Sequence, residues 1–318
     1  MIEVQHLTKK YGSHTAVEDL SFTVQDGQIY GFLGPNGAGK STTMNIMTGY
    51  IGATAGTVII NGHDILEEPE EARACIGFLP EQPPLYTDMT VNEYLKFAAE
   101  LKKIPRESRK EAIETAGEKA GVTAVSGRVI RNLSKGFRQR VGLAQAILGL
   151  PPVIILDEPT VGLDPKQVVE IRDLIRSLSP EHTVILSSHI LSEISAVCDH
   201  ILIISHGRLV ASDTPEHLGE MVPHAPRLRM IVKGSLQEVE PLLQAQQNVT
   251  IVEIHPTEDS DAVEALLETA EGLDVREELS YELAVARHPV LQMSQEKASL
   301  EELFLKLTGE GSGEEKAQ

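Results

Sequence analysis

The sequence predicts an α/β protein with a mainly parallel core sheet, followed by a smaller second α/β unit. Short apolar runs typical of buried strands alternate with segments of helical periodicity from the N-terminus to Ser212. One run, Val153–Leu156, has four apolar residues, as in strands that are buried on both faces of a parallel sheet. Another, Ile29–Leu33, leads straight into a glycine-rich loop and a helix, the order found in phosphate-binding units.

The loop has the pattern G-x-x-x-x-G-K-[ST]. Its glycines let the backbone curl with amide N–H groups pointing inward, which forms a nest for an anion. Lys40 adds positive charge for the terminal phosphates, Ser41 adds a hydroxyl ligand for Mg²⁺, and the following helix directs its positive end there. We therefore expect nine residues to bind a nucleotide polyphosphate: Gly34, Pro35, Asn36, Gly37, Ala38, Gly39, Lys40, Ser41 and Thr42.

The other elements of the first unit follow from the same periodicities. Alternation predicts strands at Ile2–Val4, Ala16–Val24 and Gly56–Ile60, with Tyr11 in a turn. A capping box predicts a helical stretch from Thr90 to Lys119. The remaining expected helices are Glu67–Arg73, Lys135–Leu150, Pro165–Leu178 and Ile190–Cys198, and the remaining strands are Ile76–Leu79, Thr183–Ser188, Ile201–Ile204 and Arg208–Ser212.

The second unit begins after a linker near 219–226, where periodicity is lost. Two βα repeats and a further strand indicate a small α/β sandwich of the ferredoxin-like type. Its expected strands are Leu228–Val232, Val249–Ile254 and Ser280–Arg287, and its expected helices are Leu236–Gln246, Asp261–Glu271 and Ser299–Leu307. The resulting domains are 1–219, with a helical subdomain at about 88–150, then 220–309 and a disordered tail at 310–318.

Charge and composition limit the functional classes. The net charge is −19, and residues 220–318 carry −12 of it, with 20 acidic and 8 basic residues. Such a surface disfavours general binding to nucleic acid or anionic lipid, so we expect no nucleic-acid partner. Cys75 and Cys198 match no metal or redox spacing and are expected to be reduced core thiols. No apolar run is long enough to span a bilayer, so any action at a membrane would require a partner.

Polar residues follow the predicted strands at positions suited to catalysis. Asp157 and Glu158 follow a buried strand at the edge where open α/β sheets place their ligands. A carboxylate there can hold Mg²⁺, and the second can polarise a water. His189 follows another strand and would emerge at the same edge, where it can contact a γ-phosphate. Gln82 can donate and accept, which suits contact with Mg²⁺ and water.

A second anion site is expected at Ser134 and Gly136, which stand at a helix start. With it, the motif set resembles the nucleotide-binding subunits of ABC transporters over roughly residues 1–215. The matching segments are GPNGAGKST (34–42), Gln82, LSKGF (133–137), ILDEP (155–159), GLD (162–164) and His189. The resemblance implies a P-loop ATPase fold with ATP and Mg²⁺, working as two copies that meet head to tail around ATP.

The resemblance also implies a role for each matching residue. Tyr11 would stack on adenine, and Asp164 would communicate between subunits. Glu158 would be the general base and His189 the γ-phosphate sensor, with Lys40 on the phosphates. The expected Mg²⁺ ligands are Ser41, Gln82 and Asp157. Ser134 and Gly136 would contact the γ-phosphate held by the other copy.

The signature stretch departs from the family's LSGGQ pattern. Lys135 replaces a glycine and Phe137 replaces the glutamine, while Ser134 and Gly136 are kept, so phosphate contact is expected to survive. Lys135 either adds charge to that site or is solvated. The intact Glu158 indicates an active ATPase.

The LSKGFRQR stretch, the acidic C-terminal unit and the SLEELFLKLT ending resemble ATPase subunits of ABC-2-type exporters, such as those for drug resistance and gliding motility. Their membrane permeases are separate chains, which implies a cytoplasmic protein held at the inner face of the cell membrane by its permease. Such partners usually dock on the segment Leu79–Tyr94. There Leu85, Tyr86 and Tyr94 either line the docking groove or pack the helical subdomain.

Two alternatives concern function. A soluble ABC ATPase acting on ribosomes or DNA usually carries two motif sets or a long coiled coil, and this chain has neither. The C-terminal unit is a regulatory or dimerising module, a ligand sensor or a stabilising appendage. The apolar stripe of Leu300, Leu303, Phe304 and Leu307 suits either a partner surface or the core of its own domain.

Overall fold

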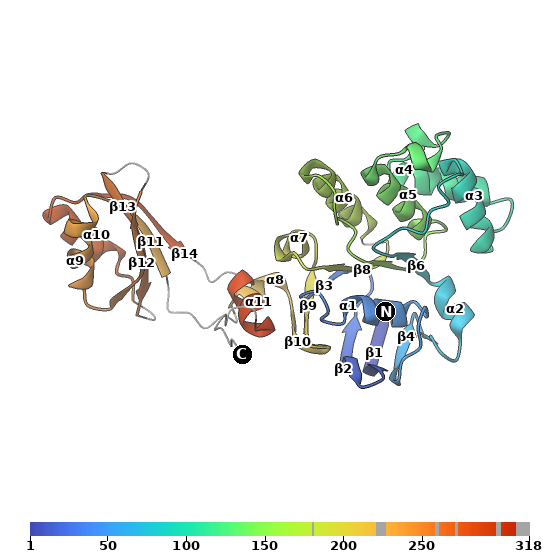
Figure 1. Cartoon of the computed structure of the whole chain (residues 1–318), viewed down its shortest axis with the longest axis horizontal. Coiled ribbons are helices and arrows are strands. Elements are labelled where there is room, and N and C mark those ends of the chain that lie inside the picture. Colours follow the sequence, from blue (N-terminus) through green and yellow to red (C-terminus); the bar gives the residue numbers. More distant parts are fainter. Residues whose placement is uncertain (180, 221–226, 258–260, 271–272, 297–299, 310–318) are drawn as a thin grey trace. The chain divides into compact units, whose positions relative to one another are not determined.

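A computed structural model describes the chain except residues 180, 221–226, 258–260, 271–272, 297–299 and 310–318 (Figure 1). The chain divides into two compact units, Met1–Pro215 together with Phe304–Gln318, and Glu216–Leu303. The expected domains 1–219 and 220–309 differ from this division in placing the first boundary four residues later and in assigning the whole C-terminal helix to the second unit. The expected tail at 310–318 and most of the expected linker lie outside the described residues.

The core of the first unit is a six-stranded sheet in the order β10-β9-β3-β8-β7-β6. All neighbouring strands are parallel except β9 and β10, which confirms the predicted, mainly parallel sheet. Every residue of β3, β7 and β8 is buried. The strands are β3 (Ile29–Leu33), β6 (Ile76–Leu79), β7 (Val153–Leu156), β8 (Thr183–Ser188), β9 (His200–Ser205) and β10 (Arg208–Asp213).

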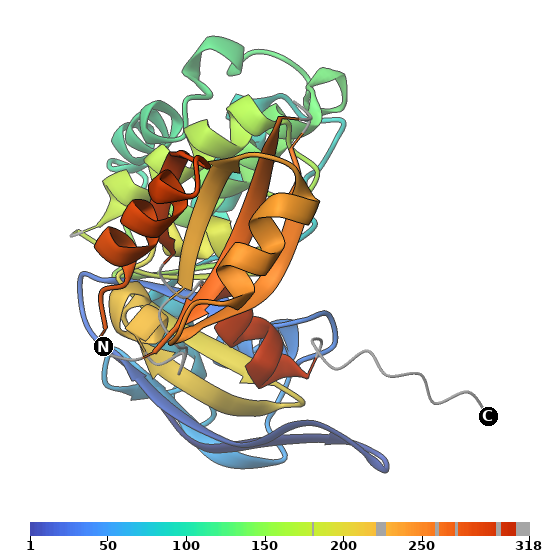
Figure 2. The ribbon, with the colours of Figure 1, turned by 90° about the vertical axis from the view of Figure 1, so that its left-hand side faces the viewer.

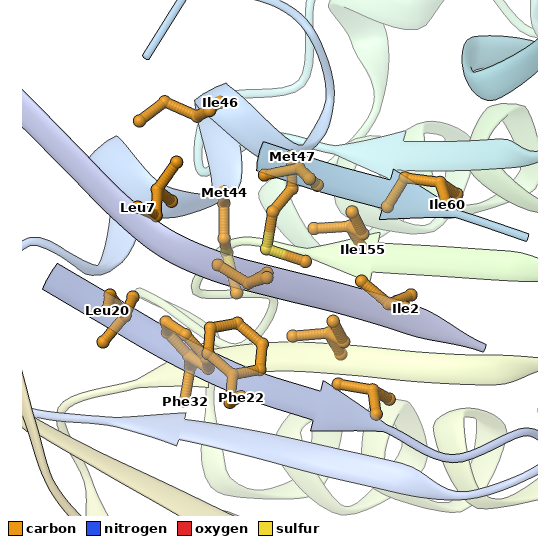
Figure 3. Packing of buried hydrophobic residues seen from close by; sticks show 14 of the residues in the cluster. Ile2, Leu7, Leu20, Phe22, Phe32, Met44, Ile46, Met47, Ile60 and Ile155 are labelled. Atoms are coloured by element: carbon orange, nitrogen blue, oxygen red, sulfur yellow. The ribbon is translucent and has the colours of Figure 1, made fainter. Parts of the chain in front are cut away.

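A second, antiparallel sheet of the same unit has the order β2-β1-β4-β5. Its strands are β1 (Ile2–Tyr11), β2 (His14–Val24), β4 (Ala55–Ile60) and β5 (His63–Asp64). The hydrophobic core includes residues of both sheets and of helix α1 (Lys40–Met47), as Figure 3 shows. Phe22 and Phe32, one from each sheet, meet edge to face with ring centroids 5.3 Å apart. This packing fixes α1, and with it the glycine-rich loop, on the core sheet.

The helical subdomain contains α3 (Val91–Leu101), α4 (Arg109–Lys119) and α5 (Lys135–Ile147). The single helical stretch predicted from Thr90 to Lys119 is therefore two helices. Pro105 lies between them, where its ring disfavours helix in the preceding residue. The predicted capping box is present: Glu93 N donates to Thr90 Oγ1 at 3.2 Å, and Thr90 N donates to Glu93 Oε2 at 2.8 Å.

The other helices of the first unit follow the predicted pattern. Helix α6 (Pro165–Leu178) has the predicted bounds, whereas α2 (Pro69–Ala74) and α7 (Leu191–Ser195) have shifted ends. Helix α7 ends three residues earlier than predicted, because Ala196 and Val197 form a turn before β9. Helix α8 (Pro215–Glu220) and helix α11 (Leu300–Thr308) lie at the joins of the two units in sequence.

The second unit has the order β–α–β–β–α–β and an antiparallel sheet with strands β12-β13-β11-β14, the ferredoxin-like arrangement (Figure 2). The elements are β11 (Arg227–Lys233), α9 (Leu236–Gln244), β12 (Val249–Pro256), β13 (Ala262–Thr269), α10 (Arg276–Val285) and β14 (Val290–Glu296). Residues of both helices and of the sheet share one hydrophobic core. This confirms the fold class expected for the unit.

Two of the predictions for this unit are wrong. The expected helix Asp261–Glu271 is strand β13, and the expected strand Ser280–Arg287 is the end of helix α10 and its C-cap. Strand β13 lies between β12 and β11, and its apolar residues are buried on both faces, so its sequence does not alternate. In α10, Leu279 and Leu283 are buried four residues apart, while Tyr281 and Val285 are exposed. Strand β14 was not anticipated.

None of the helices in the described ranges is both long and apolar enough to cross a lipid bilayer.

Gly77 of β6 lies against helix α5, which leads to a stability prediction. A Cβ atom at Gly77 would overlap the carbonyl oxygen of Ala146, and backbone cannot move aside cheaply. We expect Gly77→Ala to lower the free energy of unfolding by roughly 1–3 kcal/mol, as overpacking does in other cores. Urea denaturation followed by circular dichroism measures this. The control is Gly127→Ala, because a Cβ there meets no atom within 4 Å. Equal stability of the two variants would contradict the prediction.

Candidate functional site

A cavity of about 490 Å³ lies over the glycine-rich loop, a size suited to a small-molecule ligand. It is lined by Tyr11, His14, Ala16, Asn36, Gly37, Gly39, Lys40, Ser41, Thr42, Glu81, Glu158, Val161 and His189. These residues come from the β1–β2 hairpin, the loop before α1 and the segments that follow β6, β7 and β8. The fold therefore brings most of the residues predicted from the sequence into one place.

The loop needs glycine at its two ends for different reasons. A Cβ at Gly34 would overlap the carbonyl oxygen of Ile204 in β9. Gly39 caps α1 with φ 104°, and a Cβ there would lie 2.6 Å from the carbonyl oxygen of Ala16. Because Gly39 has no side chain, no side chain caps the first backbone N–H groups of α1. These N–H groups lie at the end of the helix that faces the cavity. This backbone suits an anion.

Lys40 is the buried cation of the site, with 6% of its surface exposed. Its Nζ donates to Gly34 O at 2.6 Å and to Pro35 O at 3.1 Å, and lies 3.9 Å from Glu158 Oε1. Burial lowers the pKa of the ammonium, while the charges of Glu158 and then Asp157 act in the opposite direction. The positive charge of Lys40, which lines the cavity, is thus offset by backbone carbonyls and by carboxylates.

Asp157 and Ser41 form the oxygen pair predicted for Mg²⁺. Ser41 Oγ donates to Asp157 Oδ1 at 3.3 Å, and Ser187 Oγ donates to the same oxygen at 2.6 Å. The described residues contain no cluster of three or more His, Cys, Asp or Glu side chains that could hold a metal. A hydroxyl and a carboxylate oxygen fit Mg²⁺, which takes one or two protein oxygens and completes its shell with nucleotide phosphates and water.

Glu158 and His189 are in direct contact. His189 Nδ1 lies 3.1 Å from both carboxylate oxygens of Glu158. Strands β7 and β8 pair in parallel register, Leu156 with Leu186, so the residues that follow them emerge at the same edge. Glu158 is 8% exposed and has φ 48°, a left-handed conformation that is uncommon for a residue with a side chain. Its N–H donates to Ser187 Oγ at 2.8 Å.

Gln82 does not line this cavity, and the neighbouring Glu81 does. Gln82 instead lines an adjacent cavity of about 380 Å³, together with residues at the start of α5. Glu81, His14 and Val161 are cavity residues that sequence reasoning missed. His14 pairs with Tyr11 across the β1–β2 hairpin, so the hairpin pattern is a signal that could have identified it. Nothing in the local sequence indicates that the cavity is lined by Glu81 and not by the neighbouring Gln82.

Three further predicted residues lie away from the Lys40 cavity. Ser134 caps α5 and accepts from Phe137 N at 3.4 Å, and Asp164 caps α6 and accepts from Gln167 N at 2.9 Å. A Cβ at Gly136 would lie 2.5 Å from Gln167 Oε1, so the starts of α5 and α6 touch. The Nζ of Lys135 lies close against Gly162 of the same chain. The start of α5 lies beside the Lys40 cavity, because Lys135 lines the adjacent cavity together with Glu81 and Val161, which line both cavities.

Comparisons with known proteins show which family this chain resembles in sequence and structure. Residues 17–161 match the family described as ABC transporter. The chain is 34% identical over 317 residues to the bacitracin transport ATP-binding protein of Bacillus licheniformis, covering 98% of each chain. It is 33% identical over 311 residues to the daunorubicin/doxorubicin resistance ATP-binding protein of Streptomyces peucetius, covering 97% of this chain and 92% of that one.

Solved structures agree with this similarity. The chain resembles a structure described as the ATP binding subunit of an ABC transporter, with TM-score 0.63 and 29% identity, over 69% of this chain and 92% of that one. It also resembles the dimeric structure of the bacterial ABC transporter cassette MJ0796, with TM-score 0.61 and 26% identity, over 67% of this chain and 98% of that one.

The different positions of Glu81 and Gln82 lead to a binding prediction. Without Mg²⁺, the Glu81 carboxylate repels the phosphates of a nucleotide in the cavity. We therefore expect Glu81→Ala to bind ATP about two- to fivefold more tightly in EDTA, the range of an exposed charge interaction. Gln82→Ala is the matched control and is expected to bind ATP as the unchanged chain does. Fluorescence titration with a labelled ATP measures both, and a stronger effect of Gln82→Ala would refute the assignment.

Proposed function

The chain belongs to the ABC transporter family of ATP-binding proteins, and we propose that two copies meet head to tail around ATP and drive export through a separate membrane permease. As a member of this family the chain is an ATPase that couples ATP hydrolysis to transport. One observation carries the dimer. Lys40, Glu158 and His189 line the nucleotide cavity, whereas Ser134 and Gly136 at the start of α5 do not. A helix start suits an anion, so in this proposal the start of α5 contacts the γ-phosphate of the ATP that a second copy holds.

The residues predicted for the nucleotide site have distinct tasks in this proposal. The loop amides and Lys40 bind the phosphates of ATP, and the half-exposed Tyr11 ring stacks on adenine. Ser41 and Asp157 would hold Mg²⁺, which would offset the negative charge of the phosphates. Glu158 accepts the proton of the attacking water on a carboxylate oxygen. His189, in contact with that carboxylate, orients the water and contacts the γ-phosphate.

Lys40 then offsets the negative charge that develops on the transferred phosphoryl group. Its ammonium is already desolvated and held by backbone carbonyls, so little reorganisation is needed when ATP replaces them. Hydrolysis by this route depends on positioning and electrostatics more than on covalent chemistry.

Export is supported by relatives that match along nearly the whole chain. The proteins from B. licheniformis and S. peucetius are named for bacitracin transport and for daunorubicin/doxorubicin resistance. A third, from Bacillus subtilis, is named for linearmycin resistance and is 30% identical over 97% of this chain. These names favour a transporter over a soluble ATPase acting on ribosomes or DNA. The permease would hold the chain at the inner face of the cell membrane.

The permease docks, in this proposal, on the segment after β6. Tyr94 is buried, its OH donates to Pro84 O at 3.4 Å, and burial raises its pKa to about 12. It therefore packs the helical subdomain. Tyr86 is 55% exposed and lies edge to face on Phe97, with ring centroids 5.3 Å apart. Tyr86 and the half-buried Leu85 are the residues available to a partner.

The first test addresses the general base. We expect Glu158→Gln to lower ATP hydrolysis by at least about 100-fold, because general base catalysis contributes that much. The variant should still bind ATP and accumulate as an ATP-bound dimer, which size-exclusion chromatography with light scattering detects. Lys40→Met, which cannot hold the phosphates, serves as the monomeric control. Undiminished hydrolysis by Glu158→Gln would remove Glu158 from the mechanism.

The second test addresses the permease. A tagged chain is used to pull partners from detergent-solubilised membranes of its source cells. We expect a polytopic membrane protein to be recovered, and Tyr86→Ala to recover at least about fivefold less of it, as for an interface anchor worth more than 1 kcal/mol. Tyr50→Ala is the control, since Tyr50 is 79% exposed and lies in the segment between α1 and β4. Recovery of ribosomes or DNA without a membrane protein would favour the soluble alternative.

A further inference from the structure

Helix α7 begins two residues after His189 and is fixed firmly to the first unit. It packs on β3, where Ile194 fills the space that a side chain at Gly31 would need. The guanidinium of Arg176 in α6 donates to the carbonyl oxygen of Ala196 at the end of α7. A side chain on this short helix can therefore serve as an anchor for the segments beside it.

Glu193 of α7 accepts two hydrogen bonds on one carboxylate oxygen. Thr160 Oγ1 donates to Glu193 Oε2 at 2.6 Å, and Ser188 Oγ donates to the same oxygen at 3.2 Å. Both hydroxyl residues are buried. Thr160 lies two residues after Glu158, and Ser188 directly precedes His189. One carboxylate thus joins the segment that carries the proposed base to the segment that carries the proposed sensor.

These two segments need such a restraint. Glu158 has a left-handed backbone, which persists only where surrounding contacts hold it. Ser187 supplies one tie, because its Oγ contacts both Asp157 Oδ1 and Glu158 N. Glu193 supplies a second tie on the other side of Glu158. The same Ser188 hydroxyl also accepts from Ile190 N at 3.0 Å, so the bond reaches across His189.

We propose that Glu193 is a positioning residue for ATP hydrolysis, which holds the 158–160 and 188–190 segments together so that His189 Nδ1 stays within 3.1 Å of the Glu158 carboxylate. This inference rests on the proposed roles of Glu158 and His189. Glu193 does not line the nucleotide cavity. Its loss therefore affects the hydrolysis step and leaves ATP binding in place.

The hydrogen bond between Thr160 and Glu193 also restrains the turn that leads to Asp164. Leu163 N donates to Thr160 O at 3.2 Å, so the residue held by Glu193 is also the start of the turn that ends at the cap of α6. In the proposed dimer this turn faces the second copy. Glu193 consequently links the base, the sensor and the inter-subunit turn of one chain through a single oxygen atom.

The experiment compares full-length variants by steady-state ATP hydrolysis and by labelled-ATP binding. Glu193→Ala is expected to lower kcat about 10- to 100-fold, the cost of a small misplacement of catalytic groups, with KM and ATP affinity changed less than about twofold. Glu193→Gln keeps an oxygen acceptor for both hydroxyl groups and is expected to retain kcat within about threefold. Ser192→Ala, an exposed neighbour on α7, is the unchanged control.

A double-mutant cycle isolates the contact. Thr160→Val should also lower kcat, and the double variant with Glu193→Ala should lose no more than the worse single variant, because both remove the same bond. Thermal unfolding checks that all variants fold; if Glu193→Ala does not, Thr160→Val and Ser188→Ala decide the question in the same way.

Two results are distinguishable. If Glu158→Gln abolishes hydrolysis while Glu193→Ala keeps the kcat of the unchanged chain, the positioning role is overturned and the proposed function stands. If Glu158→Gln itself hydrolyses ATP normally, the proposed function fails first. A parallel fall in kcat and ATP affinity in Glu193→Ala would also overturn the inference, since it would indicate general damage to the site.

Discussion

The buried ammonium of Lys40 is the interaction on which the site depends. A charge that is 6% exposed is costly unless it is paired and hydrogen-bonded, and here two loop carbonyls and two carboxylates compensate it. This requires the loop to curl back over its own lysine, which in turn requires glycine where β9 and β2 approach most closely. The carboxylates must stand at the end of β7, which lies next to β8 in the sheet. The parallel core thus arranges charges as well as packing apolar side chains.

The carboxylates are themselves held in place by hydroxyl groups. Ser187 forms hydrogen bonds with Asp157 and with the backbone of Glu158. Glu193 accepts hydrogen bonds from Thr160 and Ser188. These bonds lie in a largely buried region, where a hydrogen bond has more electrostatic strength than in water. They connect the ends of the two neighbouring strands β7 and β8, so that a change at the phosphates can reach the turn before α6. Such a connection suits the proposed dimer, in which hydrolysis at the phosphates would be linked to the second copy.

The second unit is held together by a different set of interactions. Its strands pair entirely antiparallel, and its two helices share one core with the sheet. Arg227 and Arg229 of β11 pair with Glu268 and Glu264 of the neighbouring β13. Opposite charges on paired strands offset part of the acidity of this unit, which the sequence total alone does not reveal.

The sequence by itself determined the parallel core, the phosphate loop, the caps of α3 and α5, and the positions of Asp157, Glu158 and His189. These features depend on local spacing, because neighbouring residues are enough to indicate strand ends, helix caps and a contiguous loop. Only the tertiary structure decided that Glu81 lines the cavity and Gln82 does not, that Glu193 joins two strand ends, and that 262–269 is a strand. The reason is physical, because side-chain direction after a strand and burial on both faces are set by contacts between residues far apart in the chain.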